Sequence, residues 1–564
     1  MSKSKTTPLS KPATQAKAIP NSSTSNKSWF TEDNICLMLL LLVIGMVFII
    51  RSKFSGIPFE RDEGAYSYYG KMLLEGKIPY KDFYEQKFPG LFYFFGFMVS
   101  VFGSSVKELH TGFMYLNIAS ILLLYFAVKK LFNSPAAIIT AATFALVSLT
   151  PNISGFTIQS EHGVAFFTSL SFFIYAMATT TKKWFYFLFM GLAMGAAFMT
   201  KTTGVFMALW GGLILLIDFF FNKPLNYKHL FKSVGFYSLG GLSVIAILFL
   251  MMYIKGSFND MLFWTIEIPK YYVNRMPLEE GIKYFGYTKD AIFQFNKFFW
   301  VHGLFAIILI VIKSIDWRTK LFTLTLAAFS FMTIVPGYYF YGHYWIQLLP
   351  GLSVLAGVTC YAILLLFKNQ FNIQSNYVKY AYIVLFGIIA YSHLSKFKNY
   401  YFKPNYNQVL KATYGNNPFP ESMEIANYIN KNSKPEDKLA VIGSEPQIYI
   451  YTNKKSPSRH IFFSTIVADV PQHKLWQREY AADIEKAKPK HIVFFNVPIS
   501  LLVQANTDKF IFDWANKYIT KNYKIVGLVD MMDNGQSKYV WNQDLNNYKP
   551  VSQNLIYIYE RNQP

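Results

Sequence analysis

The chain has 564 residues, of which 52% are hydrophobic and 19% aromatic, and its formal net charge is +22. These fractions exceed those of ordinary soluble domains, and the apolar residues stand in long blocks, so the composition predicts a polytopic α-helical membrane protein. The lysines and arginines fall mainly in the N-terminal tail, the loops and the C-terminal third. This distribution is typical of membrane topology, and we expect no nucleic-acid partner. The only two cysteines lie within apolar runs, which excludes a disulfide framework and a cysteine-based metal site.

Residues 1–30 are rich in Ser, Thr and Lys and have no apolar period, which predicts a disordered cytoplasmic tail. The first apolar run, Ile35–Ile50, is followed by Arg51, Ser52 and Lys53 rather than by a small-residue cleavage site. We therefore expect an uncleaved membrane anchor instead of a removed signal peptide.

Further apolar runs approach or reach the roughly 20 residues with which a helix crosses a bilayer, and we predict about 11 to 13 spans within residues 31–394. The longest are Phe113–Val128, Trp184–Met199, Gly204–Phe221, Val234–Ile254, Leu321–Tyr339 and Tyr344–Phe367. Lysines and arginines recur in every second loop, which places the N-terminus in the cytoplasm and the first long loop outside. If the chain has about eleven spans of this length, the C-terminus is outside too. A bacterial cytoplasmic membrane fits the Lys, Asn and Ile content best.

The loop after the first span carries an unusual set of charged residues. Asp62 and Glu63 begin a stretch rich in helix formers, and glycines and prolines around it impose a specific fold. Leu91–Gly103, which follows, is uncharged but too short to span, so we expect a re-entrant or interfacial helix that returns the loop to the membrane. The acids fit two interpretations, either solvated side chains or part of a site that also includes Asp82, Glu85 and Lys87.

Two later charged residues fall on the same predicted side of the membrane. Glu161, in "TIQSEHGVAFF", stands at the N-terminal edge of a span, where Ser160 and Glu161 would also suit helix capping. Lys201, in "FMTKTTGVF", stands at a tight turn between two spans, where a snorkelling lysine is common. Together with Asp62 and Lys87 they form a set of acids and lysines at one membrane face, which suits an anionic lipid head group.

A long outer loop is predicted over Lys255–Lys297, and it contains the aromatic and basic stretch "FWTIEIPKYYVNRMP". That stretch is typical of interfacial packing, or else of a flap over a lipid-linked sugar from which Lys270 or Arg275 reaches the phosphate. His343, in "FYGHYWIQ", enters the same surface. A lone interfacial histidine usually packs or forms hydrogen bonds, and its functional interpretation is a contact to the donor.

Residues 395–564 differ in composition, because long apolar runs stop and short strand-like segments alternate with helical ones. This alternation predicts an extracytoplasmic α/β domain. It has no Gly-rich phosphate loop and no nucleophile elbow, so we expect a structural or acceptor-positioning role. The predicted strands are Lys438–Gly443, His491–Asn496, Tyr523–Val529 and Leu555–Arg561, and the predicted helices are Glu421–Asn430 and Phe510–Lys521.

A family resemblance rests on the segments "RDEGAYSYYGKMLLEGKIPYKDFYEQKFPG", "SEHGVAFF", "TKTTG" and "GHYWIQLLPGL". Over Ile35 to about His393 the chain resembles polyprenyl-phosphate-sugar transferases with the GT-C fold. More closely, it is similar to glycosyltransferase family 39, which includes protein O-mannosyltransferases and the aminoarabinose transferases of lipid A. Where the latter have an adjacent Glu-Lys-Pro, this chain has Gln86-Lys87-Phe88-Pro89, and the acid stands at Glu85.

The resemblance implies transfer of a sugar from a polyprenyl-phosphate donor to a hydroxyl of a lipid, glycan or protein acceptor. It implies that Asp62, next to Glu63, is the base, and that Lys87, Lys201 and Arg275 stabilise the phosphate. Glu161 matches the family's second outer acid. No cofactor is required by the residues, and any metal would be held by carboxylates such as Glu85 or Glu161, which suits Mg²⁺, Mn²⁺ or Ca²⁺.

Two other classes of function stay open at this point. A transporter or flippase for lipid-linked sugars predicts charges buried in the middle of spans and inverted repeats, whereas most charges here fall at span ends. A non-catalytic membrane assembly protein that displays its outer domain would place no demand on Asp62 or Lys87.

Overall fold

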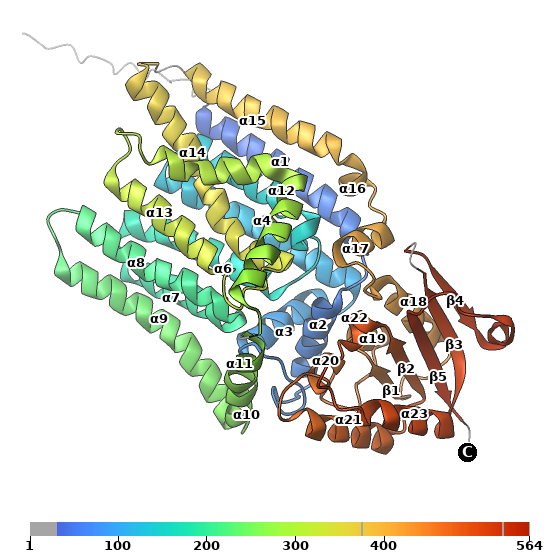
Figure 1. Ribbon diagram of the computed structural model, residues 1–564. Helices are drawn as coiled ribbons and strands as arrows, with labels where there is room; N and C mark the ends of the chain where they lie inside the picture. The colour runs from blue at the N-terminus through green and yellow to red at the C-terminus, as the bar shows by residue number, and fades with distance from the viewer. Residues whose placement is uncertain (1–30, 274, 374–375, 533–534, 563–564) are drawn as a thin grey trace, which may run out of the picture.

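The computed structural model describes residues 31–273, 275–373, 376–532 and 535–562. The predicted disordered tail, residues 1–30, lies outside these described residues. Figure 1 shows a large bundle of helices, coloured blue to yellow, with a smaller region of strands and helices, coloured orange to red, packed against one end of it. The predicted combination of a polytopic helical membrane part and a C-terminal α/β region is therefore confirmed.

Within the described residues, eight helical segments are long and apolar enough to cross a membrane, and three apolar helices are shorter. The helices of the long segments are α1 (Glu32–Phe54), α4 (Val106–Leu131), α6 (Ser160–Thr181), α8 (Val205–Phe221), α9 (Tyr227–Ile254), α12 (Leu278–Leu309), α14 (Leu349–Gln370) and α15 (Asn376–Lys396). The shorter ones are α3 (Gly90–Phe102), α5 (Ser134–Val147) and α7 (Trp184–Thr200). Some predicted spans, such as Trp184–Met199, thus correspond to helices of the shorter class.

Exposure of apolar side chains distinguishes the outer helices from the inner ones. α9 exposes Leu242 and Leu250 by 62% and 56%, whereas nearly all of α5 is buried among α1, α4 and α14. A soluble protein does not leave whole apolar helix faces in water, so these faces contact lipid. The small residues of α5 allow its neighbours to approach closely, which is typical of helix packing in membranes.

One predicted span boundary was wrong, and one predicted outer loop is largely helical. The predicted span Leu321–Tyr339 is α13 (Trp317–Met332), which ends before Pro336 because proline and the left-handed Gly337 that follows it cannot continue a helix. The predicted outer loop Lys255–Lys297 is itself mostly helical, since residues 278–297 contain no proline, and it ends where the backbone leaves helical geometry at Asn296. It contains α10 (Phe258–Leu262), the π-helix η3 (Phe263–Glu267), α11 (Ile268–Val273) and the first half of α12.

The C-terminal region contains a five-stranded sheet in the order β1-β2-β5-β3-β4, in which only β1 and β2 pair in parallel. Its strands are β1 (Leu439–Ile442), β2 (His491–Asn496), β3 (Tyr523–Met531), β4 (Ser537–Trp541) and β5 (Leu555–Arg561). Its helices are α16 (Lys398–Phe402), α17 (Tyr406–Tyr414), α18 (Phe419–Lys431), α19 (Gln447–Thr452), α20 (Phe463–Ile466), α21 (His473–Ala487), α22 (Pro498–Leu501) and α23 (Phe510–Asn522). All four predicted strands and both predicted helices are confirmed. Sequence reasoning missed β4, a short edge strand with little burial.

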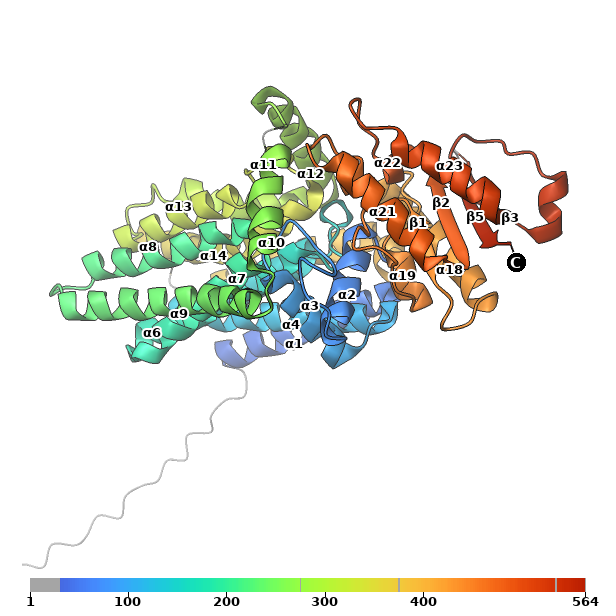
Figure 2. The same ribbon diagram turned by 90° about the horizontal axis from the view of Figure 1, so that it is seen from below.

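Helix α2 (Arg61–Leu74) lies between the bundle and the α/β region, as Figure 2 shows from below. One hydrophobic core runs through α2, α3 and the sheet, so the two regions share buried residues such as Tyr66, Phe95 and Ile448. The α/β region is therefore packed against the helices that follow the first span, and α2 is in contact with α19.

Candidate active site

Asp62 lies in the first turn of α2, at the boundary between the two regions. The helix begins at Glu60, whose Oε1 accepts a hydrogen bond from the Glu63 backbone N–H at 2.6 Å. Acidic residues in a first helical turn interact favourably with the helix dipole. Asp62 is half-buried, and its Oδ2 accepts a hydrogen bond from the Tyr66 hydroxyl at 3.3 Å. This contact fixes the carboxylate on the side of α2 that faces a cavity.

Glu63, the neighbouring acid, points into the protein instead. Its side chain is completely buried, its Oε1 lies 2.8 Å from His110 Nε2 of α4, and it accepts the Ile158 backbone N–H at 3.1 Å. Glu63 thus joins α2 to α4 and to the segment before α6. It does not line the cavity that Asp62 faces, and the structure gives it a packing position.

Lys87 is the cation of the loop between α2 and α3. Its Nζ lies 3.3 Å from Glu85 Oε1 and 5.0 Å from the centre of the Tyr66 ring. Burial disfavours its charged form, but the carboxylates of Glu85, Asp62 and Glu161 outweigh burial and raise the pKa of Lys87 above its usual value. Lys87 is therefore a permanently charged group held beside Asp62 at any pH in the physiological range.

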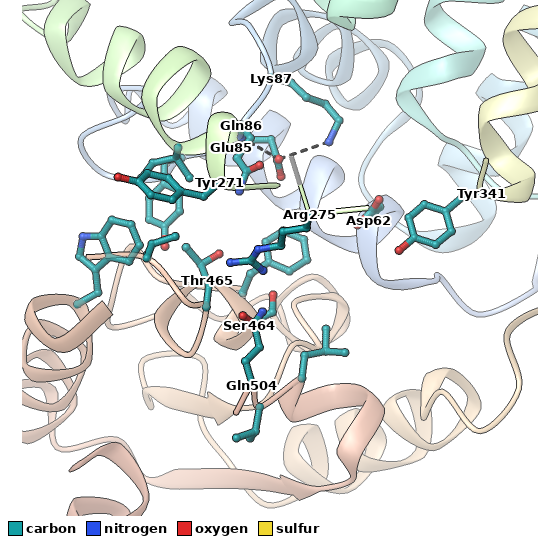
Figure 3. Close-up of a pocket in the computed structure, with 18 of the residues that line it drawn as sticks. Asp62, Glu85, Gln86, Lys87, Tyr271, Arg275, Tyr341, Ser464, Thr465 and Gln504 are labelled. Atoms are coloured by element: carbon teal, nitrogen blue, oxygen red, sulfur yellow. Dashed lines mark hydrogen bonds and ion pairs between the residues drawn. The ribbon is translucent and has the colours of Figure 1, made fainter. Parts of the chain in front are cut away.

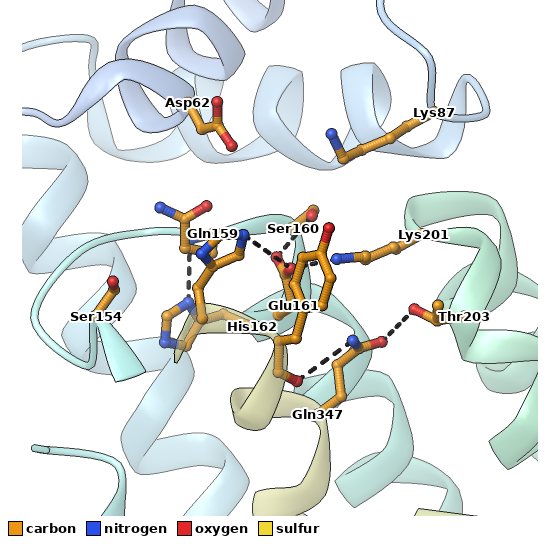
Figure 4. Close-up of polar contacts among 12 residues, drawn as sticks. Asp62, Lys87, Ser154, Gln159, Ser160, Glu161, His162, Lys201, Thr203 and Gln347 are labelled. Carbon is orange, nitrogen blue, oxygen red and sulfur yellow. Dashed lines mark hydrogen bonds and ion pairs between the residues drawn. The ribbon is translucent and has the colours of Figure 1, made fainter. Parts of the chain in front are cut away.

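A second acid and a second lysine face this pair from other helices (Figure 4). Glu161, in the first turn of α6, is buried and forms an ion pair with Lys201, which lies in the turn between α7 and α8. The Lys201 ammonium also lies 3.9 Å from the centre of the Tyr344 ring. His343, in the 3₁₀-helix η4 (Gly342–Leu348), places its Nε2 3.7 Å from Glu161 Oε1. The charges of Asp62, Lys87, Glu161, Lys201 and His343 act on one another, so the structure brings these five predicted residues together.

Neither Ser160 nor Glu161 is the N-cap of α6, because the N-cap residue is Gln159. The Gln159 backbone N–H donates to His162 Nδ1 at 3.0 Å. The loop before α6 is held by Arg51 of α1, which is buried and donates hydrogen bonds to the carbonyls of Ser148 and Gly155. The sequence predicts only an uncleaved anchor from Arg51, and its contacts to the loop before α6 were missed.

A cavity of about 650 Å³ opens between α2 and the α/β region. Asp62, Glu85 and Lys87 lie on its membrane side, together with Arg275 and Tyr341 (Figure 3). The opposite wall comes from the α/β region, from α20, from α21 and from the segment after α22, and its residues include Ser464, Thr465, Trp476, Leu502 and Gln504. The volume is that of a small-molecule site, and charged groups, hydroxyls and apolar side chains line it together.

Three other predicted residues lie in different surroundings. Asp82 is exposed, and its Oδ2 accepts the Ile78 backbone N–H at 2.8 Å, a turn-forming contact. Lys270 is exposed and forms an ion pair of 2.8 Å with Glu267. Neither lines the cavity, whereas Arg275 does, and its Nη2 donates to the Asp469 carbonyl at 3.1 Å. Arg275 thus connects the segment after α11 to the α/β region across the cavity.

The donor set does not fit a divalent cation. Among the described residues no three His, Cys, Asp or Glu side chains gather as a metal site requires. The carboxylate of Glu161 is in contact with the Lys201 ammonium, and that of Glu85 is in contact with Lys87. An ammonium group within ion-pair distance occupies the place and supplies the charge that Mg²⁺, Mn²⁺ or Ca²⁺ would supply.

Chelation is therefore expected to leave the activity of the purified protein unchanged. Activity is measured before and after dialysis against EDTA, and again after addition of Mg²⁺, Mn²⁺ or Ca²⁺. A loss of about ten-fold or more that one of these cations restores would show that a carboxylate site for a metal forms in spite of the lysines.

Comparison with known proteins gave one match to a sequence profile and several matches in fold. Residues 86–254 match the sequence profile of a family described as dolichyl-phosphate-mannose-protein mannosyltransferase. This segment includes Lys87, Glu161 and Lys201. No curated protein sequence matches the chain.

Solved structures match nearly the whole chain in fold at low sequence identity. ArnT from Cupriavidus metallidurans in the apo state has a TM-score of 0.56 and 14% identity, covering 93% of this chain and 97% of ArnT. The same protein bound to undecaprenyl phosphate has a TM-score of 0.53 and 16% identity, covering 81% and 93%. The apo oligosaccharyltransferase of Archaeoglobus fulgidus has a TM-score of 0.50 and 14% identity, covering 92% and 75%. The chain is thus a multi-span membrane protein with the glycosyltransferase-like GT-C fold, and it contains a segment like that of glycosyltransferase family 39.

Proposed function

We propose that the chain is an integral-membrane glycosyltransferase that moves a sugar from a polyprenyl-phosphate donor to an acceptor hydroxyl. The observation that carries this proposal is that a half-buried carboxylate, Asp62, and a lysine, Lys87, line one cavity, while a second lysine, Lys201, lies near enough to interact with both charges (Figure 4). These lysines come from segments far apart in the sequence. The fold and the profile match over residues 86–254 support the same class of reaction.

The reaction is a direct displacement at the anomeric carbon. The acceptor oxygen forms a bond to this carbon while the bond from the carbon to the phosphate oxygen breaks, and the departing phosphate keeps the electron pair. Asp62 takes the acceptor proton, which makes the acceptor oxygen a better nucleophile as the bond forms. Lys87 and Lys201 stabilise the negative charge that grows on the phosphate, and their positions are fixed before the reaction begins.

Glu161 has a different role in this scheme. Because its carboxylate is buried and paired with Lys201 and His343, it orients the lysine and balances its charge, and it does not exchange protons with the acceptor. Burying an ammonium without a partner costs several kcal/mol. Glu161 therefore keeps Lys201 charged in the position where it meets the phosphate.

The donor and the side of the membrane are inferred from more general features. A related fold, ArnT, has been solved with undecaprenyl phosphate, which supports a polyprenyl phosphate as the leaving group here. Lys130, Lys182, Lys223 and Arg318 of the basic loops lie together at the end of the bundle away from α2 and the cavity (Figure 1), which favours a site at the outer face of the cytoplasmic membrane. A lipid, a glycan or a protein hydroxyl would serve equally as acceptor in this chemistry.

The other two classes of function have less support. A transporter needs charged groups along a path through the bundle, whereas Asp62, Lys87 and the Glu161–Lys201 pair gather at one end of it. An assembly protein requires no carboxylate and lysine facing one cavity.

A comparison of a deletion strain with its parent tests the proposal. Mass spectrometry of surface glycans, lipid A and proteins is expected to reveal one glycoform that disappears on deletion and returns with the wild-type gene. If all three fractions were identical in both strains, the proposal would be wrong.

A further inference from the structure

The α/β region contacts both halves of the candidate site. One half is the start of α2, which carries Asp62, and the other is the loop of residues 75–89, which carries Lys87. Each half makes its own set of buried contacts to the α/β region. These contacts determine where the two charged groups stand relative to each other.

On the α2 side the contact is made by Arg61, the residue directly before Asp62. Its Nη2 donates to Glu445 Oε1 at 2.8 Å, to Asn417 Oδ1 at 3.0 Å and to the Ile499 carbonyl at 3.1 Å, and its Nε donates to the Ser444 carbonyl. Glu445 is completely buried and the Arg61 side chain is only 16% exposed. Hydrogen-bonded pairs of buried charges are the strong ones, and a planar guanidinium with four fixed acceptors has little freedom to shift.

The backbone of α2 also approaches the α/β region closely. A Cβ atom added at Gly64 would lie 2.5 Å from Gln447 Cβ and 2.7 Å from Gln447 Cα. Only glycine fits at this distance, because the neighbouring atoms are the Cβ and the backbone of Gln447 in α19, which cannot move aside without moving that helix. Arg61 and Gly64 together hold the first turn of α2 against the α/β region.

On the loop side the contact is made by Tyr84, which precedes Glu85 and Lys87. Its hydroxyl lies 2.6 Å from His460 Nδ1, and His460 Nε2 lies 3.3 Å from Glu479 Oε2. The Tyr84 ring also stacks on Trp264 of η3, with a centroid distance of 3.6 Å and an interplanar angle of 6°, and Trp264 in turn stacks on Trp476 of α21. His460 is buried behind Tyr84 and does not line the cavity.

We propose that the α/β region sets the spacing between Asp62 and Lys87, with Arg61 and His460 as the positioning residues. This inference rests on the proposed function and deepens it, because it assigns the α/β region a part in the transfer reaction. Arg61 fixes the base, so its loss acts on the chemical step. His460 fixes the loop that carries the phosphate-binding lysine, so its loss acts on binding of the lipid phosphate.

The expected effects follow from how sharply proton transfer depends on distance. A displacement of about 1 Å in a catalytic group costs up to about 10²-fold in rate. Removing Arg61 alone would leave Glu445 buried without a partner, and the protein could unfold for that reason. The test therefore uses the double variant Arg61→Met with Glu445→Gln, in which both charges are removed together.

The experiment uses the full-length protein in vesicles, with lipid-linked sugars and acceptors extracted from the deletion strain, where the unused donor accumulates. The double variant is expected to lower kcat by about ten-fold or more, with KM for the donor extract and Kd for undecaprenyl phosphate within about two-fold of wild type. His460→Phe keeps the aromatic packing and removes the contact to the Tyr84 hydroxyl. It is expected to raise both KM and Kd about ten-fold with a smaller change in kcat.

Lys71→Ala is the matched control, because Lys71 is another cation of α2 that contacts the α/β region, at Asn453, but lies about two and a half turns away from Asp62. It is expected to change none of these quantities by more than about two-fold. The thermal unfolding midpoint of every variant is measured, to confirm that each variant is folded when its kinetics and binding are compared with those of wild type.

Two results would overturn the inference. The first is a folded double variant with wild-type kcat while Asp62→Asn is inactive, which would leave the proposed function intact. The second is a His460→Phe variant that binds undecaprenyl phosphate as wild type does. If Asp62→Asn itself kept wild-type turnover, the proposed function would fail instead, and the binding measurement would still decide on the positioning role of His460.

Discussion

The Asp62→Asn variant is expected to fold normally and to lose sugar transfer, with kcat lowered about 10²- to 10⁴-fold. Asparagine has the shape of aspartate and still accepts the hydrogen bond from Tyr66, but it cannot take a proton from the acceptor. Because the loss is one of proton transfer rather than of contact, KM for the donor is expected to change little. Turnover of extracted donor lipid in vesicles measures both quantities.

Asp82→Asn is the control for this variant. Asp82 is a second acid of the same loop region, is exposed and accepts a hydrogen bond from the Ile78 backbone N–H, which asparagine can also accept. Asp82 does not line the cavity, so the activity of the Asp82→Asn variant is expected to stay within about two-fold of wild type. Loss of activity in Asp82→Asn with retention in Asp62→Asn would move the base to Asp82.

Lys87→Met is the second large expected effect. Methionine keeps the length and the packing of the chain against Tyr66 but removes the charge that meets the departing phosphate. Loss of one such group in an electrostatic site costs about 10²- to 10³-fold in kcat. Weaker binding of undecaprenyl phosphate is expected with it, since the same charge attracts the product. The pKa of Lys87 is raised, so its charge persists as pH rises through the ordinary range of lysine, and no alkaline loss of activity is expected from this group.

The role of Lys201 is tested by replacing it together with Glu161, and Lys270 provides the control. Lys201→Met alone would leave Glu161 buried without a partner, so Glu161→Gln accompanies it. This double variant is expected to behave as Lys87→Met does. Lys270→Met removes an exposed lysine of the same membrane face that is paired with Glu267, and it is expected to bind undecaprenyl phosphate as wild type does. Equal losses in all three lysine variants would mean that general surface charge, rather than this site, attracts the lipid phosphate.

The membrane part and the α/β region could be predicted from the sequence because each is indicated by a local pattern of residues. Uncharged runs of nearly 20 residues identify spans, and alternation of strand and helix patterns beyond residue 395 identified the sheet region. Helix ends were less predictable. Residues 278–297 are predicted to belong to a loop between two spans, and the sequence does not predict that they form a helix that breaks at Asn296.

Within the candidate site, the sequence predicted the charged residues but not which of them face the cavity and which are buried in packing contacts. Asp62 and Glu63 are adjacent, and only the helix geometry shows that one faces the cavity while the other turns toward His110 of α4. Successive residues of a helix point about 100° apart, so adjacent acids seldom share a site. The cavity wall formed by the α/β region could not be predicted from the sequence for a different reason. Its residues Ser464, Thr465 and Gln504 carry no motif, and only the packing of distant segments brings them to the cavity.

The central claim is that a polyprenyl phosphate leaves as the sugar is transferred, and measuring this product tests it most directly. Wild-type protein in vesicles with extracted donor lipid and acceptor is expected to form one polyprenyl phosphate for each sugar transferred, and Asp62→Asn to form neither. Sugar movement across the vesicle membrane without any polyprenyl phosphate, or equal product from Asp62→Asn, would contradict the account.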